Sequence, residues 1–267
     1  MGKDWAKGLT KATDARVARM ADSHRGLRYV RRKPVEECDW VVRTSRTLPL
    51  GWSEEMAYLV GLTATDGCLV SARPQVNFKS QDRQLVETYL RLLGRTNAVG
   101  SQRTRSGGVA YHTQFTDPAW YEWLQGVGLT PRKSLTLGAI DVPDQFLFPL
   151  VRGLLDGDGT ITNGLHRADT RGRPGYRWEH LSTRFVSASR THLVWLETRM
   201  RRVTGVPGYL QQRTPDPARH AFFELRYGKR GSQVLLPLIY PPGAPCLERK
   251  RAIWDAYLAR REGRPVR

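Results

Sequence analysis

Hydrophobic and polar positions after residue 50 switch between helical and strand-like spacing, and the same order of spacings occurs twice. After a first apolar helix, the pattern predicts strands at 69–71 and 75–80, a helix at 82–93, strands at 98–103 and 109–115, and a helix at 118–127. After a second apolar helix, it predicts strands at 160–165 and 177–187, a helix at 191–203, strands at 208–213 and 220–227, and helices at 232–239 and 247–260. Each half is therefore predicted to follow the order helix-strand-strand-helix-strand-strand-helix.

The apolar helix at the start of each half ends in a repeated motif. Leu59–Gly67 reads LVGLTATDG and Val151–Gly159 reads VRGLLDGDG, with Gly, Leu, Asp and Gly at the same four places. The repeat predicts an N-terminal segment at 1–50 followed by two related units at 51–140 and 141–267.

Each motif helix carries a glycine in its interior, Gly61 in the first and Gly153 in the second. Glycine costs about 1 kcal/mol relative to alanine in a helix, so its recurrence at one place indicates close packing of two helix backbones. Ser53 is a suitable N-cap for the first helix. Gly67 and Gly159 are predicted to take the left-handed conformation that commonly ends a helix.

The motifs place Asp66 and Asp158 at the carboxyl ends of their helices, where unpaired carbonyl groups are already negative. If the helices pack together, the two carboxylates lie near one another and favour bound cations. Mg²⁺ is held in proteins by few carboxylates together with water and phosphate oxygens. The alternative is that each Asp-Gly pair is only a turn signal. An EF-hand calcium loop is excluded because Ile161 stands where that loop needs glycine.

The amino-acid composition indicates what kind of molecule the protein binds. The net charge is +18 and the pI is about 10.4, which favours a nucleic-acid partner. Residues 1–50 carry 12 basic and 6 acidic residues, with Arg28, Arg31 and Arg32 in one cluster, and are predicted to be a basic DNA-binding arm; a solvated tail is the alternative. Three scattered cysteines argue against a disulfide framework, and neither a signal peptide nor a membrane span is evident. The expected location is the cytoplasm, beside the nucleoid if the protein is bacterial or from a phage; an organelle is the alternative.

The paired motifs resemble those of the LAGLIDADG homing endonucleases in their single-chain form, over residues 53–262. This resemblance implies an α+β fold of two pseudo-symmetric αββαββα units, with saddle-shaped antiparallel sheets and the motif helices at their interface. It also implies that Asp66 and Asp158 are metal-binding catalytic acids, assisted by the backbone carbonyls of Thr65 and Gly157. The expected cofactor is Mg²⁺ or another divalent cation such as Mn²⁺. Thr65 departs from the family pattern because it is bulkier than the usual small residue.

The same resemblance suggests a lysine near each acid, and Lys133 and Lys250 are the candidates. They would stabilise charge on the phosphate or order a water; ordinary phosphate contact is the alternative. DNA reading is assigned to polar residues that alternate with apolar ones along the strands, namely Gln75, Asn77, Lys79, Gln211, Arg213, Glu224 and Arg226. Trp5 and the run Gly8–Val17 resemble a modular DNA-binding helix appended to some of these nucleases.

The expected protein is a monomeric, site-specific endonuclease that cuts both strands of a long double-stranded DNA target, intron-encoded or free-standing. The alternatives are an intron RNA maturase and a non-cleaving DNA-binding protein on the same fold. Nucleases that depend on histidine or tyrosine clusters are not favoured, because the six histidines form no close pair along the chain.

Overall fold

The computed structural model describes residues 15, 49–104, 107–168, 176–214 and 221–263. Residues Val42–Arg267 form one compact unit, and the fold described below is that of this unit. The basic cluster of Arg28, Arg31 and Arg32 lies outside the described residues, as does the predicted DNA-binding helix apart from Ala15. The domain boundaries at residues 50 and 140 stay predictions.

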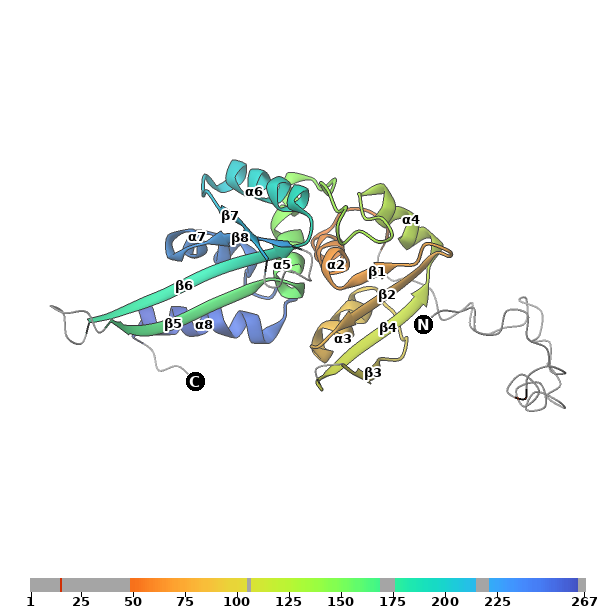
Figure 1. The fold of residues 1–267 in the computed structure, drawn as a ribbon, viewed down its shortest axis with the longest axis horizontal. Helices are drawn as coiled ribbons and strands as arrows, with labels where there is room; N and C mark the ends of the chain where they lie inside the picture. The colour runs from red at the N-terminus through yellow and green to blue at the C-terminus, as the bar shows by residue number, and fades with distance from the viewer. Residues whose placement is uncertain (1–14, 16–48, 105–106, 169–175, 215–220, 264–267) are drawn as a thin grey trace. The chain divides into compact units, whose positions relative to one another are not determined.

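The described elements follow the predicted order in both halves (Figure 1). The first half contains α2 (Glu54–Thr65), β1 (Gly67–Leu69), β2 (Gln75–Ser80), α3 (Arg83–Leu92), β3 (Gly100–Arg103), β4 (Val109–Thr116) and α4 (Pro118–Gly126). The second half contains a short 3-10 helix (Asp144–Phe146), α5 (Leu147–Gly157), β5 (Thr160–Ala168), β6 (Tyr176–Ser187), α6 (Arg190–Thr204), β7 (Tyr209–Arg213), β8 (Phe222–Tyr227), α7 (Lys229–Ile239) and α8 (Glu248–Arg261). The α+β class and the αββαββα repeat are confirmed, with α8 as an addition to the second half.

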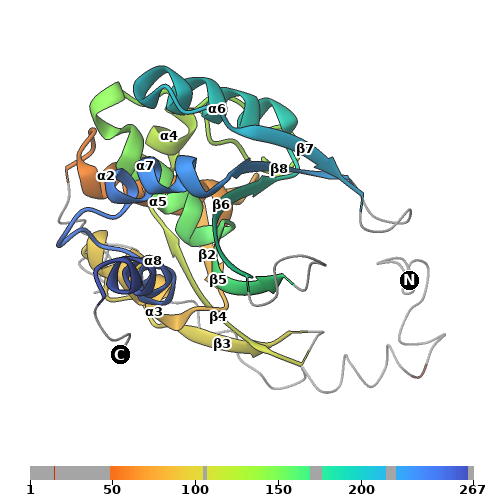
Figure 2. The same cartoon turned by 90° about the vertical axis from the view of Figure 1, so that its left-hand side faces the viewer.

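Each half builds one four-stranded antiparallel sheet, and the two sheets have equivalent strand orders, β1-β2-β4-β3 and β5-β6-β8-β7. Helices pack against one face of each sheet. The strands of both sheets extend away from the helices to the same side of the molecule (Figure 2). The opposite face of each sheet is therefore left for polar residues.

Local sequence signals explain where several helices begin. The Ser53 hydroxyl accepts a hydrogen bond from Met56 N at 3.1 Å, and the Asp117 carboxylate accepts one from Trp120 N at 3.0 Å. Ser189 does the same for His192 N at 3.4 Å. Such caps satisfy amide groups that the first helical turn leaves unpaired.

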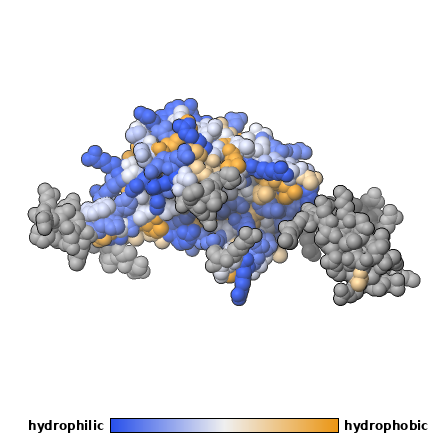
Figure 3. Space-filling model, in the orientation of Figure 1, coloured by the Kyte–Doolittle hydropathy of each residue, from blue (hydrophilic) through white to orange (hydrophobic). Residues whose placement is uncertain are grey.

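The core is continuous between the halves because α2 and α5 pack side by side at its centre. Both helices are buried along almost their whole length. The face seen in Figure 3 is largely hydrophilic and shows only small apolar patches. Among the described residues, no helix is long and apolar enough to cross a membrane.

Candidate functional site

The two motif helices approach each other through their glycines. A Cβ atom added to Gly61 would lie 2.9 Å from Gly153 Cα, and one added to Gly153 would lie 2.8 Å from Leu62 N. Real Cβ atoms do not come this close to backbone atoms, so no other residue fits at either position without moving a helix. The predicted role of Gly61 and Gly153 in the helix interface therefore has a direct geometric basis.

The bulky Thr65 is accommodated by a glycine on the opposite helix. A Cβ atom on Gly157 would lie 2.6 Å from the Thr65 Cβ, so the missing side chain of Gly157 makes room for Thr65. The Thr65 hydroxyl donates to Leu62 O at 3.0 Å, which satisfies a carbonyl near the end of α2. The departure from the family pattern is thus compensated across the interface.

The prediction of left-handed backbone at Gly67 and Gly159 is wrong. Neither glycine is among the described residues with positive φ. A Cβ atom on Gly67 would instead lie 2.7 Å from Thr63 O, and one on Gly159 would lie 2.8 Å from Leu155 O. Both glycines are required because the strand that follows each helix turns back tightly over its last turn.

Asp66 and Asp158 occupy equivalent places and share an electrostatic environment. Each is the residue that caps the carboxyl end of its helix, with φ of −88° and −93° respectively. Burial and the nearby negative charge of Asp158 raise the pKa of Asp66 to about 7. Burial also raises the pKa of Asp158, while Lys250 and Lys133 act in the opposite direction. Ionising both carboxylates therefore costs free energy, and a bound cation would reduce that free-energy cost.

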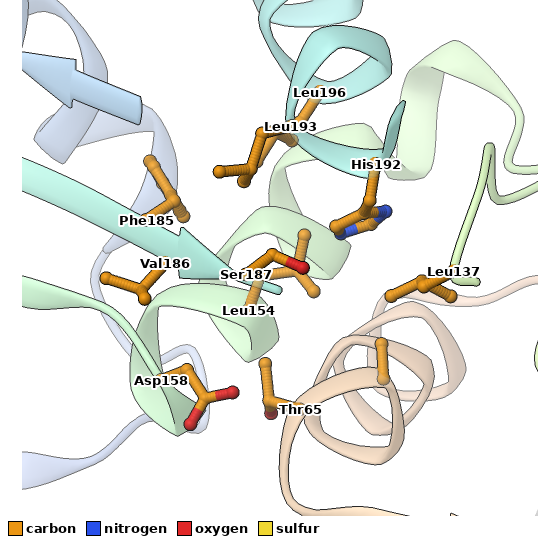
Figure 4. Close-up of a pocket in the computed structure, with 11 residues that line it drawn as sticks. Thr65, Leu137, Leu154, Asp158, Phe185, Val186, Ser187, His192, Leu193 and Leu196 are labelled. Carbon is orange, nitrogen blue, oxygen red and sulfur yellow. The ribbon is translucent and has the colours of Figure 1, made fainter. Parts of the chain in front are cut away.

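A small cavity lies beside this pair, between the ends of α2 and α5 and the start of α6. Its volume is about 30 Å³, and its polar lining includes Thr65, Asp158, Ser187 and His192. Figure 4 shows the Asp158 and Thr65 side chains next to each other at the helix ends. A space of this size with several polar neighbours is large enough for a water molecule.

The two candidate lysines both lie near the motif ends but make different contacts. Lys133 donates to Gly67 O, the residue after Asp66. Lys250 donates to three carbonyl oxygens of α5, those of Leu155 at 2.7 Å, Asp156 at 2.7 Å and Gly157 at 3.1 Å. An ammonium group has three N–H donors, so Lys250 uses all of them to cap this helix. Burial lowers the pKa of Lys250 to about 8 and also lowers that of Lys133.

The residue before Lys133 has an unusual backbone. Arg132 has a φ of 60° and is the one non-glycine residue with positive φ among those the structure describes. This conformation is uncommon for a residue with a side chain. It lies in the turn that presents Lys133 to the end of α2.

Sequence reasoning missed a buried cluster beneath the site. Asp156 is 1% exposed, and its carboxylate accepts hydrogen bonds from Tyr58 at 2.8 Å, Tyr240 at 2.6 Å and Leu247 N at 2.8 Å. Because Tyr58 belongs to α2, this acid joins the two halves, and its bond to Leu247 N positions the segment that leads to Lys250. A charged residue inside an apolar helix was the available signal, since such residues are rarely buried without partners.

The donor chemistry fits a hard divalent cation. Two carboxylates and the nearby main-chain carbonyls of Thr65 and Gly157 offer oxygen ligands, as Mg²⁺ prefers. Gly157 O already accepts from Lys250, which leaves Asp66 and Asp158 as the stronger candidates. Within the described residues, no group of three His, Cys, Asp or Glu side chains could hold a metal ion, so substrate or water oxygens would have to complete the set.

Most of the predicted DNA-reading positions share the helix-free faces of the sheets. In the first sheet, Asn77 pairs with Gln114 and the exposed Lys79 pairs with His112. In the second sheet, Gln211 pairs with Glu224 across β7 and β8. Arg226 of β8 pairs with Arg184 on one side and with Tyr209 on the other. The side chains of Arg226 and Arg213 are exposed. Arg213 and Glu224 form an ion pair with an N–O distance of 3.1 Å.

Gln75 differs from the other predicted contacts. It lies on the same strand as Asn77 and Lys79, but it is only 2% exposed. Its side-chain amide donates to the Asn77 side chain at 2.9 Å. In this structure Gln75 is therefore positioned to orient Asn77 rather than to contact DNA itself.

Two histidines that are well separated along the chain lie close together in space. Sheet pairing brings His166 and His180 to a ring-centroid distance of 6.0 Å, with Trp178 stacked on His166 at 4.6 Å. The contact arises from the register of β5 and β6, which chain spacing alone does not reveal. These aromatic residues lie far along the strands from Asp158.

Comparison with known proteins agrees with the fold and with the first motif. The family model of the LAGLIDADG-like domain matches residues 53–119, which include the first motif. Meganuclease I-SmaMI bound to uncleaveable DNA is similar in structure, with a TM-score of 0.54 and 10% identity over 83% of this chain and 92% of that chain. The I-LtrWI LAGLIDADG homing endonuclease bound to target DNA has a TM-score of 0.51 and 9% identity over 78% and 91%. No curated protein sequence matches the chain.

At such low identities the structural likeness shows the fold. The domain match supplies the first motif, and the structure places the second motif at the equivalent position beside it. Residues 53–119 therefore match a LAGLIDADG-like domain, and the described part of the chain has the two-unit fold of the LAGLIDADG structures that it resembles.

Proposed function

We propose that the chain is a monomeric, site-specific DNA endonuclease that hydrolyses one phosphodiester bond in each strand of a long duplex target. The observation that carries the proposal is the pair Asp66 and Asp158, held together at the ends of two helices beside basic residues. The net charge of +18 supports a polyanionic partner. Two structurally similar proteins are described as bound to DNA.

A divalent cation such as Mg²⁺ or Mn²⁺ would be held by Asp66 and Asp158 together with phosphate oxygens; when bound, it supplies charge neutralisation and activates a water molecule. Other residues of the chain fix the positions of the two acids. The close helix contact at Gly61 and Gly153 sets the separation of the two acids. The capping contacts of Lys250 hold the end of α5, on which Asp158 sits.

Lys133 has a more direct proposed role. Among the described residues it donates one hydrogen bond, to Gly67 O, so two of its N–H groups can serve a phosphate. A positive charge at this position stabilises the negative charge that develops on phosphorus-bound oxygens during hydrolysis. Lys250 acts on the same charge through space, because its own donors are engaged.

The test is incubation with a randomised duplex library or host-locus DNA in the presence of Mg²⁺, followed by sequencing of the cut ends. We expect cuts at one preferred sequence and loss of cutting by orders of magnitude in Asp66→Asn and Asp158→Asn. DNA affinity should stay within about tenfold or improve, since each variant removes a negative charge. Asp141→Asn, at an exposed loop position, is the matched control.

Full cleavage by the double Asp66→Asn, Asp158→Asn variant would reject the catalytic assignment. Tight binding of duplex DNA without cutting by the wild-type chain would favour a DNA-binding protein on the same fold. Preferential binding of structured intron RNA, with an effect on its splicing, would favour a maturase. These outcomes separate the three functions that the sequence left open.

A further inference from the structure

The two halves differ in the hairpin that directly follows each acid. β1 and β2 are paired over three residues, from Gly67↔Phe78 to Leu69↔Val76. β5 and β6 are paired over nine, from Thr160↔Arg184 to Ala168↔Tyr176. The six additional pairs correspond to roughly 20 Å at about 3.3 Å per residue. The greater reach of β5 and β6 is visible in Figure 1.

The longer hairpin is supported along its inner face by α8, the helix that the first half lacks. The Asn163 side chain donates to Ile253 O at 3.3 Å and accepts from Arg260. Glu179 forms ion pairs with Lys229 at 3.0 Å and with Arg260 at 3.5 Å. These contacts tie both strands of the extension to the helices, so it is a braced part of the second unit.

The outer face of the extension carries an aromatic cluster, defined here as His166, Trp178 and His180. Trp178 stacks on His166 with centroids 4.6 Å apart and meets His180 edge-on at 5.6 Å. The Trp178 residue is nevertheless 42% exposed. Exposed aromatic groups held by their neighbours offer rigid contact area at a low entropic cost.

The aromatic cluster is continuous with the predicted DNA-reading face. Side chains two residues apart on a strand share a face, so Trp178, His180 and Arg184 all lie on the same side of β6. Arg184 in turn pairs with Arg226 of β8. This face of the sheet therefore carries the exposed Arg226 and also Arg184, which lies 4.0 Å from Glu224, and it ends outward in the aromatic cluster.

We infer that the extended β5–β6 hairpin lies along the DNA and makes the target asymmetric. The half of the duplex bound by the second unit is longer than the half bound by the sheet of the first unit by up to about six base pairs, at about 3.4 Å each. The aromatic cluster contacts base pairs at the outer end of that half, where apolar contact with thymine methyl groups is available in the major groove. This inference rests on the proposed function, because it requires duplex DNA as the ligand.

The test measures the affinity of the full chain, without Mg²⁺, for the duplex selected in the cleavage screen. Two shortened targets are compared with it, each lacking the outer six base pairs at one end. We expect Trp178→Ala and the double variant His166→Ala, Trp178→Ala to bind the full target roughly tenfold more weakly, the scale of one lost base contact. On the target that lacks the outer six base pairs of the second unit's half, these variants and the wild type should have equal affinity. Val234→Ala, an exposed apolar residue on α7, is the control and should bind every target normally.

Hydroxyl-radical footprinting gives an independent readout. Protection by the wild type should extend to the outer end of one half-site, and Trp178→Ala should lose protection at that end alone. Equal weakening on the full target and on both shortened targets would overturn the inference, and so would unchanged binding by the Trp178→Ala variant. Failure of the wild type to bind any duplex would instead reject the proposed function, and this inference with it.

Discussion

Replacing Asp66 with asparagine should stabilise the protein at alkaline pH. Burial and the charge of Asp158 raise the pKa of Asp66 from 3.8 to about 7 in the folded chain. Between these two values the folded chain holds a proton that the unfolded chain releases. The stability gained from this proton is complete below about pH 4 and is lost as the pH rises through about 7. Asparagine cannot ionise, so the Asp66→Asn variant does not lose this stability as the pH rises.

The magnitude follows from the pKa difference. Three pH units at about 1.4 kcal/mol per unit give a ceiling of about 4 kcal/mol in the free energy of unfolding. Asp66 is only half-buried, so solvent reduces this, and we expect about 1–3 kcal/mol at pH 8. At roughly 2–4 °C per kcal/mol for a unit of this size, the melting temperature should rise by several degrees. At pH 4 the variant and the wild type should be nearly equal.

Urea unfolding in EDTA at pH 4, 6 and 8, followed by circular dichroism, measures the effect. Asp141→Asn, in an exposed loop, should leave stability unchanged at every pH. Adding Mg²⁺ at pH 8 should stabilise the wild type more than Asp66→Asn, because a ligand that binds only the folded state adds to its stability. An Asp66→Asn variant that is no more stable than the wild type at pH 8, or equally stabilised at all three pH values, would refute the argument.

The remaining predictions concern packing, the two lysines and the arm. Gly153→Ala should cost about 1–3 kcal/mol or more in urea unfolding, because its Cβ would lie 2.8 Å from Leu62 N. Gly126→Ala has open space and should be neutral or stabilising, so equal costs for both would contradict the packing argument. Lys133→Met should lower the cleavage rate with little change in melting temperature, whereas Lys250→Met should lower both, since it uncaps α5; wild-type cleavage by both would exclude a catalytic effect. Deleting residues 1–50 should leave a folded core that binds DNA more weakly, with a log–log salt slope flatter by about 0.9 per lost phosphate contact; an unchanged slope would make the segment a solvated tail.

Much of the fold could be predicted because its signals are local. β2 has the predicted bounds, Gln75–Ser80, and α4 begins at Pro118, as predicted. β5 was predicted to end at Leu165 but continues to Ala168, because its last three residues pair with β6, from His166↔Trp178 to Ala168↔Tyr176. Local propensity does not include such support from distant segments.

The candidate site was predictable in part. The motif repeat placed Asp66 and Asp158 at equivalent helix ends, and the structure adds the burial and mutual charge that raise the pKa of each. The network of Asp156 could not be derived, because its partners Tyr58 and Tyr240 are 98 and 84 residues away along the chain. Lys250 was singled out as a candidate, but its use as a helix cap depends on how α8 docks against α5.

The amino-acid sequence by itself determined the repeat, the order of the elements, the two acids and the positive charge, because each follows from residue type and spacing along the chain. The tertiary structure alone decided that Gly157 makes room for Thr65 and that His166 meets His180. It also decided that the second unit carries a longer, braced hairpin. These features depend on the register and docking of segments far apart in the chain, and backbone atoms at such contacts allow changes of only a few tenths of an ångström.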